Sequence, residues 1–293
     1  MKASGAIRVP FYKYLMNILF LGNSQILTAI RHLPKLLNQL PNNDLYIEMV
    51  YVAAAKVTTL LRNFKMPMST EFIVTKTHSG NIIWRYVYGQ DRWDEMKFPD
   101  VSIQDVLKSK EWDIIITCGH TGKNGVLNYD RYTEKYKKFF REIRRCSKAK
   151  IYWLCGLTPN REFCDTQIYD ECSGGSRRGM LKYLNVTDKK ICNDYHLKSI
   201  PMRQAYEILV EQFPGYNGLV MDNIHPDRGV GEYFCTAYLY NFFFKPIYGV
   251  DLSELRFSYD ASKHKYKNTD IQCISVDEKT KKIVDDVVNF CYI

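Results

Sequence analysis

The chain has 293 residues, of which 46% are hydrophobic and 25% are charged, the balance of an ordinary soluble globular protein. Its apolar runs fall short of the roughly 18–20 residues that a membrane span requires; examples are Tyr14–Leu21, Ile114–Ile116 and Tyr240–Phe244. A membrane span is therefore not expected, whereas the net charge of +9 leaves a polyanionic partner open.

The N-terminus carries cationic residues ahead of an apolar stretch, as a signal peptide does. That stretch runs straight into Gly22-Asn23-Ser24 without a small-residue cleavage site. We therefore interpret residues 1–15 as a leader or peripheral segment. Length alone allows one large domain or two small ones. Because no convincing linker interrupts the remainder, residues 16–293 are expected to form a single domain.

Apolar segments alternate with amphipathic segments along the rest of the chain. The expected strands are Asn17–Leu21, Asp44–Val50, Trp112–Cys118 and Lys150–Gly156, with further extended pieces at Glu71–Thr77 and Gly218–Met221. The expected helices are Gln25–Leu40, Ala53–Asn63, Ser102–Lys108, Val230–Phe244 and Asp277–Phe290. Such alternation is typical of a parallel sheet with helices on both faces. The sequence therefore predicts an α/β fold.

A strongly basic stretch from Arg131 to Lys150 carries apolar residues at helical spacing. These residues are Tyr132, Tyr136, Phe139, Phe140 and Ile143. The pattern favours an amphipathic surface helix whose basic face is solvated. Nucleic-acid binding through that face is the alternative, although no recognised nucleic-acid motif accompanies it.

Residues 158–198 are polar and glycine-bearing, and they lie between a predicted strand and the approach to His225. We expect a long irregular loop here, acting as a lid, as a substrate-recognition loop or as decoration alone. Arg177 and Arg178 within it would either meet an acidic substrate or remain solvated.

Nine cysteines are scattered along the chain without the spacing of a disulfide framework. An odd count without such spacing favours reduced thiols and a cytoplasmic protein. Four of them share one segment, but their gaps lack any CxxC pair: Cys155, Cys164, Cys172 and Cys192. Buried or incidental thiols are therefore favoured over a zinc site. Neither a metal nor a cofactor is expected.

Ser24 ends the apolar run Ile18–Leu21 in the pattern Gly-x-Ser. Such a run describes a buried strand whose last turn delivers a hydroxyl to the edge of the sheet. A serine in this position often caps the following helix instead, and both interpretations are open for Ser24 taken alone.

Asp222 precedes His225 by three residues, a separation that brings the two side chains together on a helical turn. The carboxylate would then accept from one ring nitrogen while the other nitrogen faces a nucleophile. Taken alone, Asp222 would suit a helix N-cap and His225 a structural role. Together with Ser24, they supply the nucleophile, the general base and the orienting acid of acyl transfer.

The order of these residues argues against the α/β-hydrolase elbow, Gly-x-Ser-x-Gly. That elbow would need glycine at position 26, which is Ile26, and an acid well before the histidine. A different serine-hydrolase scaffold fits better.

The chain resembles the SGNH, or GDSL-type, hydrolase family in the branch that reads Gly-Asn-Ser. The blocks that match are Ile18–Ser24 and Asp222–Pro226, with weaker likeness at Trp112–His120 and Lys150–Leu154. The resemblance implies a flavodoxin-like three-layer α/β/α fold. It also implies ester hydrolysis without a metal, commonly the deacetylation of carbohydrates.

The family takes its oxyanion donors from the serine N–H, a glycine in the second block and an asparagine in the third. By this resemblance Gly80 is the candidate glycine, and Asn124 or His120 is the candidate third donor. The third block departs from the family pattern Gly-x-Asn-Asp, since Asn124 lies five positions beyond Gly119.

The sequence and the resemblance together predict a serine esterase that hydrolyses small acyl esters, an acetyl by resemblance, on a small molecule or a glycan. A catalytically weak or inactive glycan-binding protein on the same scaffold is one alternative. An acyltransferase that uses the same triad is another. The oligomeric state stays open.

Overall fold

The computed structural model describes residues 16–41, 45–52, 54–65, 82–85, 92–97, 102–119, 121, 126–163 and 166–291. Their strands form one sheet in the order β4-β3-β2-β1-β5-β6-β7. The bounds are β1 (Met16–Gly22), β2 (Leu45–Tyr51), β3 (Ile82–Arg85), β4 (Asp94–Lys97), β5 (Ile114–Cys118), β6 (Lys150–Leu154) and β7 (Lys198–Ile200). Strands β2, β1, β5, β6 and β7 are parallel, and β3 and β4 add antiparallel pairings beyond β2. The predicted parallel central sheet is confirmed.

The parallel strands follow the flavodoxin-like order of a doubly wound fold, 2-1-3-4-5 when numbered among themselves. The direction of winding reverses between β1 and β5. In open α/β sheets, ligands bind beyond the carboxyl ends of the strands at this switch point. Strand β1 ends at Gly22, so the residues that follow it emerge at that place.

Strand β1 is apolar from Ile18 to Leu21 because both of its faces are buried there. Consecutive side chains of a strand point to opposite faces of the sheet. Accordingly, Ile18 and Phe20 enter one hydrophobic core, and Leu19 and Leu21 enter the other.

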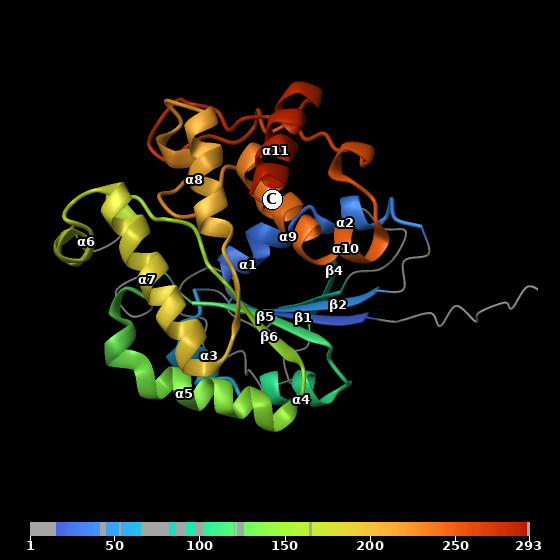
Figure 1. The fold of residues 1–293 in the computed structure, drawn as a ribbon, viewed down its shortest axis with the longest axis vertical. Helices are drawn as coiled ribbons and strands as arrows, with labels where there is room; N and C mark the ends of the chain where they lie inside the picture. Colours follow the sequence, from blue (N-terminus) through green and yellow to red (C-terminus); the bar gives the residue numbers. More distant parts are fainter. Residues whose placement is uncertain are drawn as a thin grey trace, which may run out of the picture.

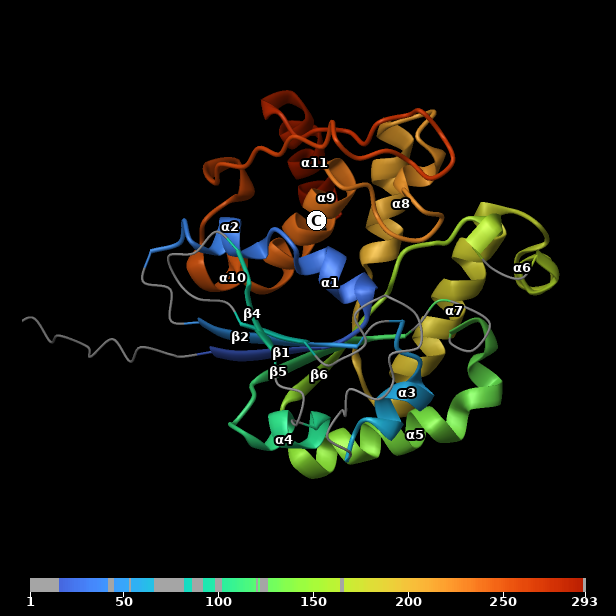
Figure 2. The same cartoon turned by 180° about the vertical axis from the view of Figure 1, so that it is seen from behind.

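Helices cover both faces of the sheet, as Figures 1 and 2 show from opposite sides. One layer contains α1 (Ser24–Ile30), α2 (Leu33–Leu37), α8 (Met202–Gln212), α9 (Val230–Phe243), α10 (Lys245–Tyr248) and α11 (Glu278–Phe290). The other contains α3 (Val57–Arg62), α4 (Ile103–Lys108), α5 (Tyr129–Cys146) and α7 (Arg177–Tyr195), and α6 (Thr166–Ser173) packs against α7. Short 3-10 helices are η2 (Val126–Asn128), η3 (Arg161–Phe163), η4 (Asn217–Leu219) and η5 (Leu252–Glu254). The predicted three-layer α/β/α fold is confirmed.

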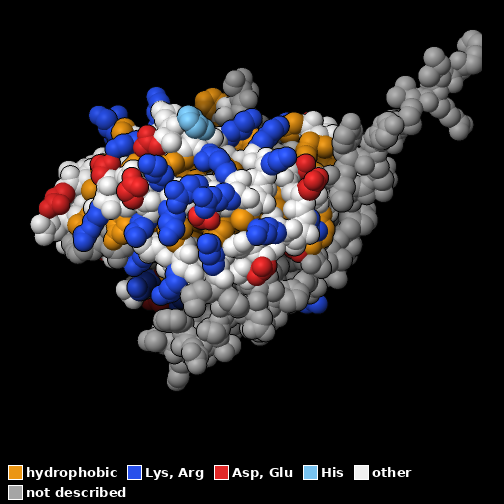
Figure 3. Space-filling model, turned by 90° about the horizontal axis from the view of Figure 1, so that it is seen from below, with side chains coloured by type: hydrophobic (Ala, Val, Ile, Leu, Met, Phe, Trp, Pro, Cys, Tyr) orange, Lys and Arg blue, Asp and Glu red, His pale blue; other side chains and the backbone are white. Residues whose placement is uncertain are grey.

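Helix α5 is amphipathic, as its sequence predicts. Tyr136, Phe139, Phe140 and Ile143 are buried against the sheet. The Lys and Arg side chains of α5 are exposed, and Figure 3 shows such side chains gathered on the face of the molecule seen from below. Within the described residues, no helix is both long and apolar enough to cross a bilayer.

The single helix predicted over Gln25–Leu40 is wrong, because the chain forms α1 and α2 with a break between them. Pro34 lies in the first turn of α2. A proline inside a helix lacks the N–H donor and collides with the carbonyl four residues earlier, which here belongs to Ile30. Helix α1 therefore ends at Ile30.

The irregular loop expected at 158–198 is also wrong, because most of it is helical. Ser176 caps α7 by accepting a hydrogen bond from the N–H of Gly179. Met180, Leu184 and Ile191 of α7 then recur at helical spacing and are fully buried. The glycines around Ser176 obscure this helical spacing in the sequence. Because the segment is mostly helical, the irregularity that suggested a lid is absent.

Two further expectations concern extended pieces. Gly218–Met221 contains the end of η4 and a single antiparallel bridge from Val220 to Pro226, not a strand. Glu71–Thr77 lies outside the described residues.

A buried ion pair joins the sheet to two helices. Asp188 of α7 accepts from Trp153 Nε1 of β6 at 2.7 Å and pairs with the guanidinium of Arg203 in α8. The side chains of Arg203 and Asp188 are only 1% and 4% exposed. Neither charge has solvent to stabilise it if its partner is lost.

We expect Arg203→Leu to lower the free energy of unfolding by about 3–5 kcal/mol, because it leaves the Asp188 charge buried without a partner. Urea denaturation measures this loss. Adding Asp188→Asn removes the orphaned charge and keeps an acceptor for Trp153, so the double variant should recover part of the loss. A double variant no more stable than Arg203→Leu alone would contradict this account.

Candidate active site

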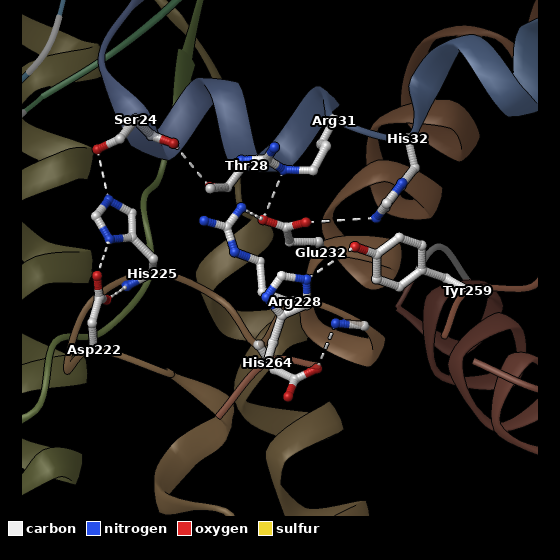
Figure 4. A network of polar contacts seen from close by, with 12 residues as sticks. Ser24, Thr28, Arg31, His32, Asp222, His225, Arg228, Glu232, Tyr259 and His264 are labelled. Atoms are coloured by element: carbon white, nitrogen blue, oxygen red, sulfur yellow. Dashed lines mark hydrogen bonds and ion pairs between the residues drawn. The ribbon is translucent and has the colours of Figure 1, made fainter. Parts of the chain in front are cut away.

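Ser24, His225 and Asp222 meet at the carboxyl edge of the sheet, as predicted for a triad (Figure 4). Ser24 Oγ lies 2.6 Å from His225 Nε2. His225 Nδ1 lies 2.7 Å from Asp222 Oδ2. The three side chains therefore form one continuous chain of hydrogen bonds, the geometry that acyl transfer requires of a nucleophile, a base and an orienting acid.

Asn23, and not Ser24, caps α1. The Asn23 side-chain oxygen accepts from the N–H of Gln25 at 3.0 Å, and its amide nitrogen donates to the carbonyl of Ala55 at 3.2 Å. The thiol of Cys118, at the end of β5, donates to the same Asn23 oxygen at 3.4 Å. Because Asn23 takes the capping role, the Ser24 hydroxyl is free to face His225.

The Asp222–His225 segment is a tight turn, so the helical turn expected here is wrong. Asp222 Oδ1 accepts from the N–H of His225 at 2.8 Å, while Oδ2 accepts from the ring. Asn223 has φ of +72°, a left-handed conformation that asparagine tolerates better than most residues. The N–H of Met221 donates to the carbonyl of His225 at 2.9 Å and closes the turn.

Three residues that sequence patterns did not single out for this role hold the turn in place. The N–H of Asn160 donates to the carbonyl of Asn223 at 2.8 Å. Arg177 donates to Asn160 Oδ1 at 2.8 Å and forms a two-pronged ion pair with Glu207 at 2.8 and 3.0 Å. Arg177 therefore braces the turn, whereas the sequence suggested an acidic substrate or solvent as its partner. In the sequence, the only sign of a role for Asn160 near the triad residues is its position after the end of β6.

The Asp222 carboxyl is half-buried, and two opposing effects act on it. Burial, the largest effect, raises its pKa, but the hydrogen bond and charge of His225 and the N–H groups of His225 and Ile224 together outweigh burial. The net pKa lies below the ordinary value of 3.8. The carboxylate is therefore ionised at neutral pH and able to fix one tautomer of the imidazole ring.

Gly80, His120 and Asn124, the candidate oxyanion donors, lie outside the described residues. Gln25, one residue after Ser24, is buried and donates to Thr121 Oγ1 at 3.0 Å. This hydrogen bond connects the start of α1 to Thr121, which is the only described residue between 120 and 125.

No group of three or more His, Cys, Asp or Glu side chains in the described ranges is arranged to hold a metal ion. Of the cysteines considered for zinc, Cys155 contacts Ser199 Oγ at 3.4 Å. Burial raises the pKa of the Cys192 thiol to about 12, which keeps it protonated. Cys164 lies outside the described residues.

The chain matches no family model and no curated protein. Among solved structures, it is similar to a DUF4886 family protein from Bacteroides uniformis, with a TM-score of 0.67, 14% identity and 94% of each chain covered. A "putative SGNH hydrolase" from Slackia heliotrinireducens gives a TM-score of 0.48 at 13% identity, covering 78% of this chain and 98% of the other. At such identities the likeness concerns the fold, which the Bacteroides protein shares over nearly its whole length.

The lowered pKa of Asp222 predicts a pH-dependent contribution to stability. That contribution is fully present above the ordinary pKa of 3.8 and is lost as the pH falls through the folded-state value. We therefore expect the difference in Tm between the wild type and Asp222→Asn to be largest above about pH 4 and to shrink at lower pH. Calorimetric melts across this range measure it. The exposed Asp270→Asn serves as the control, and a difference for Asp222→Asn that stays constant with pH would refute the expectation.

Proposed function

We propose that the protein is a serine esterase that works through an acyl-enzyme. The observation that carries this proposal is the unbroken hydrogen-bond chain from Ser24 through His225 to Asp222. The resemblance of the Gly-Asn-Ser and Asp-x-x-His-Pro blocks to the SGNH family supports the same activity.

In the first step, Ser24 Oγ attacks the ester carbonyl carbon and His225 Nε2 takes the hydroxyl proton. Asp222 holds the proton on Nδ1 and stabilises the imidazolium ion that forms. When the tetrahedral intermediate collapses, the bond to the alcohol breaks and the alcohol leaves with the proton from Nε2. The acyl group then remains on Ser24.

In the second step, a water molecule attacks the acyl carbon while His225 takes one of its protons. The bond to Ser24 Oγ breaks, Oγ regains a proton from Nε2, and the carboxylic acid leaves. An acceptor alcohol in place of water would make the same site an acyltransferase, since the first step is common to both. Product analysis with a sugar acceptor in excess separates the two activities.

The N–H of Ser24 is the donor we assign first to the oxyanion. It lies in the first turn of α1, where N–H groups have no partner within the helix. No described residue accepts a hydrogen bond from it. We assign Gly80 and either Asn124 or His120 as the other donors, following the resemblance. A single donor of this kind is worth about 2.7–4 kcal/mol of transition-state stabilisation.

The substrate that we propose is a small acyl ester, an acetyl by resemblance, on a carbohydrate or small molecule. The side chains of Asp222 and His225 are 34% and 25% exposed, so the site opens to solvent and admits a substrate at the sheet edge.

We expect Ser24→Ala and His225→Ala each to lower kcat/KM for a reactive acetyl ester by about 10³-fold or more, because each removes a member of one catalytic unit. Steady-state hydrolysis of 4-nitrophenyl acetate provides the measurement. Ser258→Ala, an exposed serine outside the triad, is the matched control and should retain full activity. A Ser24→Ala protein with unchanged turnover would refute the proposal.

A further inference from the structure

A cluster of charges lies beside Ser24, His225 and Asp222, along helix α1 (Figure 4). At its centre is Glu232 of α9, whose side chain is 0% exposed. Arg31 Nε donates to Glu232 Oε1 at 2.9 Å, and Arg228 Nη1 donates to the same oxygen at 3.1 Å. Two guanidinium groups therefore converge on one carboxylate.

Each arginine follows one of the proposed catalytic residues closely in the chain. Arg31 follows Ser24 by seven residues, which is two turns of α1 and roughly 10 Å along its axis. Thr28 lies between them, with its hydroxyl donating to the carbonyl of Ser24 at 2.9 Å. Arg228 follows His225 by three residues, in the segment that leads into α9.

One arginine is enough to balance Glu232, so the cluster has a surplus positive charge. His32, 3.6 Å from Glu232 Oε2, does not consume the carboxylate charge, because burial lowers the pKa of its ring despite the opposing effect of Glu232. Burial raises the pKa of Tyr51 by more than the positive charge of Arg31 lowers it, so Tyr51 stays neutral. No carboxylate in the described residues other than Glu232 forms an ion pair with Arg31 or Arg228.

The surplus charge faces solvent beside the site. The side chains of Arg31 and Arg228 are 32% and 27% exposed, although the carboxylate they share is fully buried. Among the described residues, each guanidinium uses one nitrogen for Glu232 and none of the others has a hydrogen-bond partner. Free N–H groups of a guanidinium suit the planar, two-pronged recognition of a carboxylate or a phosphate.

We propose that Arg31 and Arg228, held in place by Glu232, form an anion-binding subsite next to Ser24, so that the preferred ester carries a carboxylate or a phosphate. This inference rests on the proposed esterase function and adds the class of substrate to it. If the arginines only neutralised Glu232, the reaction would not distinguish charged esters from neutral ones.

Two pairs of esters test the subsite, one with the charge on the acyl group and one with the charge on the alcohol. The mono(4-nitrophenyl) ester of adipic acid carries a carboxylate on the acyl chain, and 4-nitrophenyl hexanoate is its neutral partner of equal length. 4-Acetoxybenzoate carries the charge on the leaving alcohol, and phenyl acetate is its neutral partner. The wild type should prefer the charged member of at least one pair by about tenfold in kcat/KM, because a hydrogen-bonded charge pair contributes on this scale. The preference should fall as salt is added.

Single substitutions identify the source of the preference. Arg31→Gln and Arg228→Gln each leave the other arginine to balance Glu232, so the fold should survive, as Tm would show. Each should lower the preference for the charged ester about tenfold. Arg31→Lys keeps the charge and should keep part of the preference, which separates charge from a change in folding. Arg145→Gln, on α5, is the control for net charge and should change nothing.

Calorimetry of benzoate and phenyl phosphate binding to the full chain tests whether the subsite binds anions without relying on turnover. It also shows which of the two anions binds more tightly. Weaker binding of either anion to Arg31→Gln and Arg228→Gln, by about tenfold, supports the subsite. Failure of every ester to react would reject the esterase and leave this binding result to stand alone. Equal binding and equal preference in the wild type and both variants would overturn the inference.

Discussion

The hydrogen bond between Ser24 Oγ and His225 Nε2 is the contact on which the proposed chemistry of this protein depends. It joins residues 201 positions apart and so requires two distant segments to be held in register. Helix α1, which begins at Ser24, packs along α9, which begins five residues after His225. Thr236 of α9 donates to the carbonyl of Ala29 at 3.0 Å, and Glu232 binds Arg31 at the end of α1. The buried α9 is thus the element that sets the distance from Ser24 to His225.

The same packing explains why a buried carboxylate is present so close to the site. Burying Glu232 without a partner would cost several kcal/mol, and the two arginines offset that cost. The pairing also fixes the direction of both guanidinium groups, since each must reach the same oxygen. A structural contact between α1 and α9 therefore produces an oriented positive surface near the Ser24 hydroxyl. Stability and substrate choice would then depend on one cluster.

Much of the fold could be predicted because burial on both faces makes strands β1, β2, β5 and β6 rich in apolar residues. The amphipathic period of α5 was equally readable. Other features depend on forces that no local pattern reveals. Pro34 divides a run that reads as one helix, and β7 has only three residues, so its apolar content is too small to detect.

The proximity of Ser24, Asp222 and His225 could be predicted from residue types and order, since the three residues lie in short, specific blocks. Helix α1 is capped by Asn23 instead of Ser24, and this arrangement depends on contacts with Ala55 and Cys118, which are distant in sequence. The brace from Asn160 through Arg177 to Glu207 and the Arg31–Glu232–Arg228 cluster likewise join separate elements. Spacing carries no information about such contacts, because only the folded chain brings the partners together.

The most direct test of the central claim is to expose the purified protein to a fluorophosphonate probe and locate the adduct by mass spectrometry. The probe reports an activated serine whatever the natural ester is. We expect an adduct on Ser24 that is lost in His225→Ala, since the hydroxyl depends on that base to become nucleophilic. An unlabelled Ser24, under conditions that label a known serine esterase, would contradict it, as would equal labelling in the His225→Ala variant.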